Sequence, residues 1–472
     1  MLRFTTTEQA YPPTRAADAR VGDFNEISPV FDAGALALQA SRCSQCGVPF
    51  CQIHCPLSNN IPDWLKLAAE GRLEEAYAIS SATNNFPEIC GRICPQDKLC
   101  EGNCVIEKGF GAVTIGAVEK TITETAFAEG WVKPIKVTRE TGQSVGIIGA
   151  GPAGLAAADM LRREGHSVTV YDRYDRTGGL MIYGIPNFKL DKAIVKRRDA
   201  LLRAGGIQFQ LNIQVGVTIS LNTLRARHDA LLIATGVYKP RELGVRGDTL
   251  AGIHPAMDFL TASNRKGLGD AVPAFDAGDL NAAGKRVVVI GGGDTAMDCV
   301  RTAVRQGAAS VTCLYRRDRA NMPGSSREVK HAEAEGVMFE WLAAPDAFIG
   351  ETTVARVVVQ RMGLSTAGDA GRSQALPIAG DIYEIEADMV IKALGYDADD
   401  LPAMFQAPEL AVSKHGTLAV DSRFMTSLPN VYAAGDIVRG ASLVVWAIRD
   451  GRDAAASIHH ALTHAKAANY VA

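Results

Sequence analysis

The stretch SVGIIGAGPAGLAAADMLRREGHSVTVYDR, residues 144–173, decides the fold. An apolar run, a glycine-rich turn, a helix-forming segment and a second β-forming run that ends in an acid follow one another in it. In the pattern G-x-G-x-x-G, Gly149 makes the tight turn, Gly151 lets a pyrophosphate approach the backbone, and Gly154 lets helix pack on strand. Asp172 is placed to accept hydrogen bonds from a ribose. An ordinary tight turn would need none of these neighbours, so the stretch predicts a dinucleotide-binding unit.

A second unit of this kind occupies residues 285–319, KRVVVIGGGDTAMDCVRTAVRQGAASVTCLYRRDR, with Ala296 as the last residue of a G-x-G-x-x-A pattern. Its second β-forming run ends in two arginines, where an acid would bind a ribose 2′-hydroxyl. A guanidinium pair suits a 2′-phosphate and predicts NADP, whereas a merely solvated strand end is the plainer interpretation. The expected NADPH ligands are Gly291, Gly293, Thr295, Arg316 and Arg317, with Arg327 as a third positive charge.

Two nucleotide units in series imply two cofactors, of which one should be a flavin. LLIATG (231–236) closes the first half, and NVYAAGD (430–436) returns late in the chain as another strand that ends in Gly-Asp. Its final Asp binds the flavin ribityl or pyrophosphate region, or else caps a helix. The next segment, 442–462, is predicted as a helix whose positive N-terminus faces the flavin pyrimidine edge. The expected FAD site consists of Gly149, Gly151, Gly154, Asp172, Gly179, Gly236, Gly435, Asp436 and Ser442.

Eight of the ten cysteines lie within residues 43–104, as C-x2-C-x4-C-x3-C-P and C-x3-C-x5-C-x3-C. Reduced core cysteines do not cluster in this way, and zinc sites usually place two ligand pairs a dozen or more residues apart. Close spacing with a following proline is typical of iron–sulfur segments, in which the last cysteine of a run can ligate the other cluster. We therefore predict two [4Fe-4S] clusters: one held by Cys43, Cys46, Cys51 and Cys104, the other by Cys55, Cys94 and Cys100, with Cys90 or Glu119 as the fourth ligand.

The predicted fold class is α/β, with two Rossmann-like dinucleotide-binding domains arranged as in flavin disulfide reductases and preceded by an α-helical iron–sulfur domain. The segment 61–80 between the cysteine runs has apolar residues at helical spacing, but the region has little else to bury, so we expect it to depend on its clusters for folding. The expected domains are 1–140 (two [4Fe-4S] clusters), 141–280 (FAD, first part), 281–395 (NADPH) and 396–472 (FAD, second part).

A net charge of -3 gives no support for nucleic-acid binding, which usually needs a basic face. No run of 18 apolar residues and no signal-peptide pattern is present, so we expect a cytoplasmic protein without a membrane partner. A reducing compartment also favours metal ligation by the cysteines over disulfides.

The cysteine runs, GAGPAGL (149–155), GGLMIYGIPNFKLDK (178–192), GGGDTAMD (291–298) and AAGD (433–436) together resemble, in order and spacing, the small (beta) subunit of bacterial NADPH-dependent glutamate synthase. The resemblance runs from about Arg42 to the end. It is shared in part with the N-terminal half of dihydropyrimidine dehydrogenase and with electron-bifurcating ferredoxin:NADP oxidoreductases. In those relatives the fourth ligand of the second cluster is not cysteine, and VTIGAVE (113–119) resembles the segment that supplies it.

The resemblance implies an electron-input subunit. NADPH would give hydride to FAD, and electrons would pass through the clusters to a large (alpha) subunit with FMN and its own iron–sulfur cluster, which makes L-glutamate from L-glutamine and 2-oxoglutarate. A subunit of a bifurcating NAD(P)H:ferredoxin-type enzyme or of a pyrimidine reductase is the alternative, and a cluster-bearing redox sensor is a third. Intact glycines in both nucleotide turns favour an enzyme. The 178–192 segment lacks the redox-active cysteine pair of disulfide reductases, and hydride transfer requires no general acid or base, so we name none.

Overall fold

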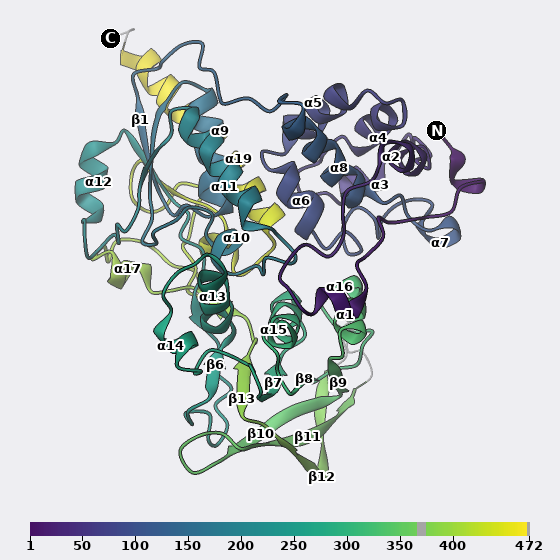
Figure 1. The fold of residues 1–472 in the computed structure, drawn as a ribbon. Coiled ribbons are helices and arrows are strands. Elements are labelled where there is room, and N and C mark those ends of the chain that lie inside the picture. Colours follow the sequence, from purple (N-terminus) through teal and green to yellow (C-terminus); the bar gives the residue numbers. More distant parts are fainter. Residues whose placement is uncertain (366–373, 470–472) are drawn as a thin grey trace.

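The computed structural model describes residues 1–365 and 374–469 and divides into a helical N-terminal part and two parallel sheets with flanking helices (Figure 1). The fold class is therefore as predicted. None of the helices in these two ranges is long and apolar enough to cross a membrane.

The N-terminal part has an apolar core of its own, which corrects our expectation that it has little to bury. Trp64, Leu65, Val118 and Ile122 are all almost completely buried. Asp32 begins one of the helices as an N-cap, since its Oδ1 accepts the Ala35 N–H at 2.8 Å. The helices are α1 (Ala17–Arg20), α2 (Ala33–Ala40), α3 (Phe50–Ile53), α4 (Ile61–Ala69), α5 (Leu73–Thr83), α6 (Pro87–Ile93), α7 (Glu107–Phe110) and α8 (Ile115–Ala128), with a 3-10 turn, η1, at Arg3–Thr5.

The first sheet is wholly parallel and has the order β15-β4-β1-β2-β3. Its outermost strand β15 comes from the end of the chain and pairs with β4, so the two halves of this domain enclose the second one in sequence. The strands are β1 (Ser144–Ile148), β2 (Ser167–Tyr171), β3 (Gln208–Gln210), β4 (Ala230–Ile233) and β15 (Val431–Ala433). Its helices are α9 (Pro152–Arg163), α10 (Leu180–Tyr183), α11 (Lys192–Ala204), α12 (Leu221–Arg227), α17 (Leu401–Met404), α18 (Asp436–Arg439) and α19 (Val444–Asn469).

The second sheet is also parallel, in the order β6-β13-β7-β8-β9. It includes β6, which precedes residue 281, where we predicted this domain to begin. The pattern missed β6 because it has only three residues, includes Pro255 and has no glycine-rich turn after it. The strands are β6 (Ile253–Pro255), β7 (Arg286–Ile290), β8 (Ser310–Tyr315), β9 (Met338–Trp341) and β13 (Met389–Lys392), and the helices are α13 (Ala256–Gly267), α14 (Pro273–Asp276), α15 (Asp294–Arg305) and α16 (Ser326–Ala334).

Two smaller sheets complete the fold. Strands β5 (Lys239–Pro240) and β14 (Tyr396–Asp397) pair antiparallel where the chain enters and leaves the second domain. Strands β10 (Ala343–Ile349), β11 (Arg356–Leu364) and β12 (Ala375–Glu386) form an antiparallel sheet at the bottom of Figure 1.

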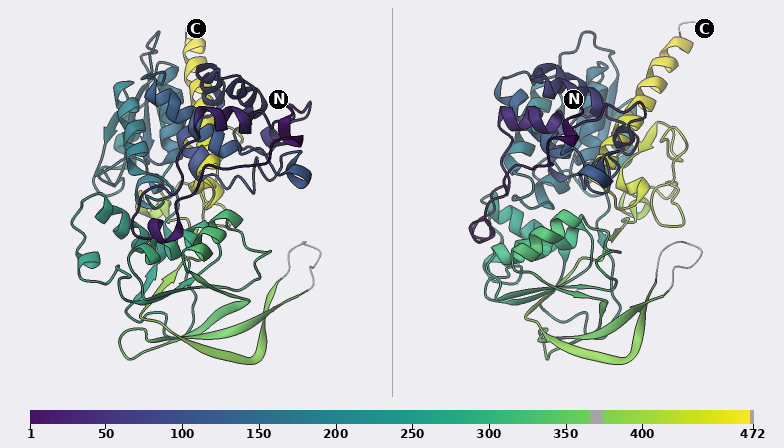
Figure 2. Two further views of the ribbon diagram at one scale, coloured as in Figure 1. Left: turned by 45° about the vertical axis from the view of Figure 1, so that its right-hand side comes forward. Right: turned by 90° about the vertical axis from the view of Figure 1, so that its right-hand side faces the viewer.

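The N-terminal arm runs down from the helical domain and ties it to the second domain (Figure 2). Helix α1 lies beside α16, where the buried side chains of Arg20 and Glu335 form an ion pair with 2.8 Å between Nε and Oε1. The second nucleotide unit is thus tied to the N-terminal arm.

Candidate flavin, nucleotide and cluster sites

The first glycine-rich turn opens onto a cavity at the carboxyl ends of β1, β4 and β15. Gly149 has φ +112°, and a Cβ there would lie 2.3 Å from the Ala234 carbonyl oxygen. A Cβ at Gly154 would lie 1.9 Å from the Gly149 oxygen, whereas one at Gly151 would meet open space. The turn can therefore be built only with glycine at its first and last positions, and its middle position leaves the backbone free to approach a ligand.

Asp172 lines this cavity from the end of β2 and is held rigidly. It is 9 % exposed, and its two carboxylate oxygens accept the backbone N–H groups of Ala150 at 2.6 Å and Tyr174 at 2.8 Å. Burial raises the pKa of Asp172, while these two amides oppose the rise. Each oxygen keeps a second lone pair that can accept a hydrogen bond from a ribose hydroxyl.

Asp436 lies on the opposite side of the cavity, after β15. Its Oδ1 is buried and has no hydrogen-bond partner among the described residues, and burial raises its pKa to about 6. Asp436 is the first residue of α18, whose N-cap is Gly435, and no side chain caps this helix. A buried polar atom without a partner is costly unless a ligand completes it, so the site fits a flavin dinucleotide with hydroxyl and phosphate groups.

The structure gathers most of the predicted flavin residues around this one cavity. Gly435 lies just behind its wall, with φ +79° and a would-be Cβ 2.9 Å from the Ala153 Cβ. The sequence did not reveal the aromatic side of the site, where the Arg173 guanidinium stacks 4.5 Å over the Tyr238 ring in an adjoining cleft of about 470 Å³. The lining residues that we predicted are Gly149, Gly151, Asp172, Gly179, Gly236, Asp436 and Ser442.

One group of thiols lines a second cavity. Cys55 of the first run lies there with Cys90, Cys94 and Cys100 of the second run. Glu119 also lines it; its Oε1 accepts hydrogen bonds from Ser80 and Asn84, and burial raises its pKa to about 7. Cys90 and Glu119 thus both face the cavity, and either side chain can supply a fourth ligand.

The remaining thiols form another group, to which Cys104 of the second run belongs. Burial raises the pKa of Cys51 to about 12, and the neighbouring thiols of Cys104, Cys43 and Cys46 contribute to the rise. Within the described parts of the chain, no three His, Cys, Asp or Glu side chains are gathered as ligands of a single ion would be. Cysteine thiolates are the ligands of a four-iron cluster.

The second glycine-rich turn has the geometry of the first. Gly291 has φ +146°, and a Cβ there would lie 2.3 Å from the Ala393 oxygen, while Gly293 begins α15 and faces open space. Arg316 is exposed at the end of β8, and Arg317 is half-buried with an Nε that has no hydrogen-bond partner in the part of the chain that the structure describes. An arginine donor left unpaired at this strand end suits a phosphate.

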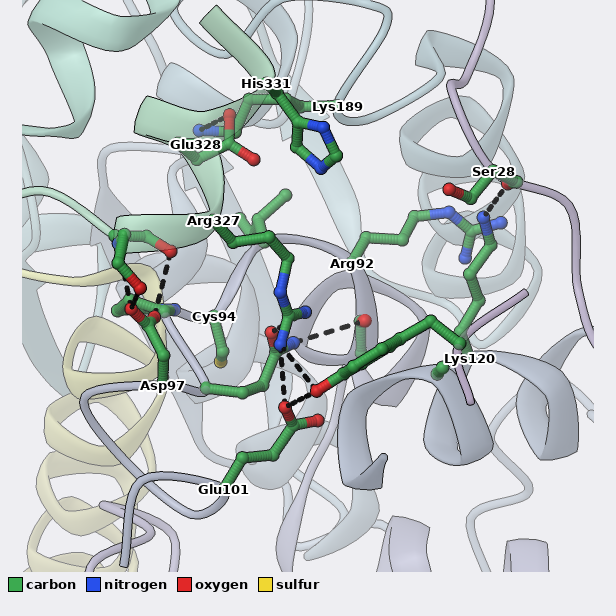
Figure 3. A pocket seen from close by; sticks show the side chains of 18 of the residues that line it. Ser28, Arg92, Cys94, Asp97, Glu101, Lys120, Lys189, Arg327, Glu328 and His331 are labelled. Atoms are coloured by element: carbon green, nitrogen blue, oxygen red, sulfur yellow. Dashed lines mark hydrogen bonds and ion pairs between the residues drawn. The ribbon is translucent and has the colours of Figure 1, made fainter. Parts of the chain in front are cut away.

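Arg327 points elsewhere, into the cleft of about 650 Å³ between the helical domain and the second domain (Figure 3). Its guanidinium donates to Glu101 Oε2 at 2.7 Å and to the Tyr11 hydroxyl at 3.0 Å. Arg327 lies in the first turn of α16, which directs its side chain toward the helical domain. Its guanidinium is therefore engaged in the ion pair with Glu101 and does not join Arg316 and Arg317 at the end of β8.

The same cleft contains a hydrogen-bonded link between the nucleotide turn and the second cysteine run. Asp97, between Cys94 and Cys100, accepts hydrogen bonds from the hydroxyls of Ser325 and Ser326, both at 2.9 Å. The Ser325 backbone N–H donates to Asp294 Oδ1 at 3.0 Å, in the first turn of α15. The loop before α16 is therefore hydrogen-bonded both to the start of α15, at the nucleotide turn, and to the second cysteine run.

Comparison with known proteins agrees with this division of the chain. A family model described as dihydropyrimidine dehydrogenase domain II, 4Fe-4S cluster, matches residues 20–131, and one described as pyridine nucleotide-disulphide oxidoreductase matches residues 143–451. The glutamate synthase [NADPH] small chain of Azospirillum brasilense is 62% identical over 97% of this chain and 96% of that protein. The chain belongs to the glutamate synthase [NADPH] small-chain family. The small chain of Escherichia coli (strain K12) is 43% identical over 97% of this chain and 98% of its own length.

The family is one of NADPH-dependent oxidoreductases with an iron–sulfur domain, as the motifs indicated. Among solved structures, FprA of Mycobacterium tuberculosis in complex with NADPH has a TM-score of 0.60 and 22% identity, over 70% of this chain and 86% of its own. That likeness shows the fold of the two nucleotide-binding domains.

Proposed function

We propose that the chain is the cytoplasmic electron-input subunit of a glutamate synthase. It takes hydride from NADPH at FAD, and electrons leave through two [4Fe-4S] clusters to a large subunit that carries FMN and an iron–sulfur cluster. That partner makes two L-glutamate molecules from L-glutamine and 2-oxoglutarate. The 62% identity to a small chain over nearly the whole length supports this assignment over the other oxidoreductases.

The observation that carries the proposal is the shared wall between the flavin cavity and the cavity lined by Cys55, Cys90, Cys94 and Cys100. Val444 and Ala447, in the first turn of α19, line the flavin cavity. Val445, between them in sequence, lines the cavity of Cys55, Cys94 and Cys100. A single helical turn therefore separates a two-electron site from a one-electron site, and the group of Cys43, Cys46, Cys51 and Cys104 lies beyond it.

In this proposal the chain's own residues bind and orient FAD, NADPH and the clusters. Asp172 would hold the adenosine ribose, Asp436 the ribityl or pyrophosphate region, and Gly149 to Gly154 the pyrophosphate at the N-terminus of α9. Arg316 and Arg317 would hold the 2′-phosphate of NADPH, and the cysteine groups the clusters. The bound flavin supplies the step from hydride to single electrons, and the apolar first turn of α19 keeps water from the route between the cavities.

The pyrimidine-reductase alternative has one specific support, the match of residues 20–131 to a dihydropyrimidine dehydrogenase domain. The acceptor decides between the two functions.

Steady-state oxidation of NADPH by the purified holoprotein tests the proposal. We expect turnover with ferricyanide, and coupled turnover with a glutamate synthase large subunit but not with a ferredoxin or a pyrimidine-reducing domain. Coupling to either of the latter alone would assign the alternative function, and failure to reduce any dye with FAD bound would indicate a redox sensor.

A further inference from the structure

Arg42, directly before the first cysteine, is completely buried and has no carboxylate partner within residues 1–365 and 374–469. Its relative exposure is 0 %. Nε donates to the Thr7 carbonyl at 3.0 Å, Nη1 to Ala112 at 2.6 Å, and Nη2 to Phe110 at 2.6 Å and Gly111 at 3.0 Å. None of the ion pairs found in the described residues includes Arg42. Four carbonyl dipoles satisfy its N–H groups but leave its positive charge uncompensated.

Other buried arginines of this domain are neutralised. Arg92, whose side chain is 5% exposed, pairs with Glu26 at 2.6 Å and Glu124 at 2.9 Å. A buried cation without such a partner is costly unless an anion faces it. Cys43 follows Arg42 in sequence, and Cys104 and Tyr11 lie close enough for their charges to act on the guanidinium.

Neighbouring donors add to this positive environment. The Gln45 backbone N–H and its Nε2 approach the Cys43 sulfur at 3.4 and 3.3 Å. The Ser44 hydroxyl lies 3.0 Å from the Cys46 sulfur. The segment RCSQC thus surrounds the group of Cys43, Cys46, Cys51 and Cys104 with a cation and polar hydrogens, which raise the potential of an iron–sulfur cluster.

The other thiol group has the opposite environment. Glu119 lines its cavity, and none of the ion pairs found in the described residues includes Glu119. Glu101, whose charge acts on Cys100, is itself paired with Arg327. A cluster that accepts an electron gains one negative charge. A nearby cation stabilises that reduced form, and nearby carboxylates destabilise it.

We propose that Arg42 raises the reduction potential of the cluster at Cys43, Cys46, Cys51 and Cys104 above that of the cluster nearer the flavin. Electrons that cross the first turn of α19 then move downhill in free energy, away from the flavin and toward the exit to the partner. The inference rests on the proposed function, because it needs a cluster at each thiol group. Arg42 acts on the cluster through its positive charge and does not contact a substrate.

The test is an anaerobic potentiometric titration of the holoprotein followed by electron paramagnetic resonance, with iron and labile sulfide measured on each sample. The variants are Arg42→Gln, which loses the charge, and Arg42→Lys, which keeps it but cannot make all four carbonyl contacts. Arg72→Gln is the matched control, since that arginine is half exposed and paired with Glu70 and Glu75. We expect only Arg42→Gln to move the higher-potential cluster signal to more negative potential, with the other signal unmoved. Arg42→Lys should lower thermal stability but keep both potentials.

Equal shifts in Arg42→Gln and Arg42→Lys would mean that the contacts matter and not the charge, and would overturn the inference. An unmoved potential in Arg42→Gln, or a shift of the lower-potential signal, would overturn it as well. If Arg42→Gln loses its clusters, Arg42→Lys decides: unchanged potentials support the inference, and a negative shift contradicts it. Absence of two four-iron clusters in the unaltered protein would instead reject the proposed function.

Discussion

Arg327 and Glu101 form an ion pair, with Nη2 and Oε2 2.7 Å apart, that joins the nucleotide-binding domain to the residue directly after Cys100. The arginine side chain is 35% exposed and the glutamate 3% exposed, so breaking the pair strands a carboxylate in a mostly buried position. The pair holds the two domains together at the cleft in Figure 3.

We therefore expect Arg327→Gln to lower the free energy of unfolding by about 1–2 kcal/mol, less than for a fully buried pair because water reaches the arginine. The kcat/KM ratio for NADPH over NADH should stay unchanged, as should the ratio in the control Arg319→Gln, which removes an exposed pair with Glu333. A fall in the ratio for Arg327→Gln alone would show that Arg327 also binds the 2′-phosphate, as the sequence predicts.

Replacing Arg316 and Arg317 together with glutamine should reduce the preference for NADPH. Loss of two charge-assisted contacts to the 2′-phosphate is expected to cost roughly 2–4 kcal/mol of discrimination if the pair is desolvated when NADPH binds. The measurement is again the kcat/KM ratio for the two coenzymes. An unchanged ratio in the double variant would assign the selection to other residues.

Asp436 should make the stability of the flavin-free chain depend on pH. Burial raises its pKa to about 6 in the folded chain, above the value of roughly 3.9 in an unfolded one. The folded state thus binds the proton more tightly, so this group's contribution to the free energy of unfolding is greatest at low pH. It is lost as pH rises from about 4 to about 6. Asp436→Asn should remove roughly 2–3 kcal/mol of that dependence.

Urea unfolding of both flavin-free proteins at several pH values measures this difference. If the free energies of unfolding of the two proteins changed in parallel between about pH 4 and pH 6, Asp436 would have an ordinary pKa and the prediction would be wrong. In the flavin-loaded protein, Asp436→Asn should also weaken FAD retention, because a carboxylate that accepts hydrogen bonds becomes an amide that accepts fewer.

Replacing Cys90 and Glu119 one at a time tests which of them is the fourth ligand of the second cluster. Since residues 113–119, which end in Glu119, resemble the segment that supplies a non-cysteine ligand in dihydropyrimidine dehydrogenase, we expect Cys90→Ala to keep about eight irons and eight sulfides, four per cluster. Glu119→Ala should lose part of the iron or alter the resonance of one cluster. Cys299→Ala, a buried cysteine of the nucleotide domain, is the control. Iron loss in Cys90→Ala with an intact Glu119→Ala would reverse the assignment.

The sequence predicted most reliably what local geometry imposes. Gly149 and Gly291 have no room for a Cβ, and their spacing from strand and helix revealed both sheets. It failed where contacts are long-range. The three-residue strand β6 takes its place only through its parallel neighbour β13, and the direction of Arg327 depends on Glu101, 226 residues away. The apolar core around Trp64 and Ile122 likewise joins helices separated by the second cysteine run, so its size could not be judged from either helix alone.

The most direct test of the central claim is glutamate formation with and without the large subunit. The purified chain should oxidise NADPH with an artificial acceptor but form no glutamate from glutamine and 2-oxoglutarate. Adding the large subunit should couple the oxidation of one NADPH to the formation of two glutamates, and removing iron should abolish that coupling before it abolishes dye reduction. Glutamate formation by the chain alone, or coupling that persists after the clusters are lost, would contradict the account.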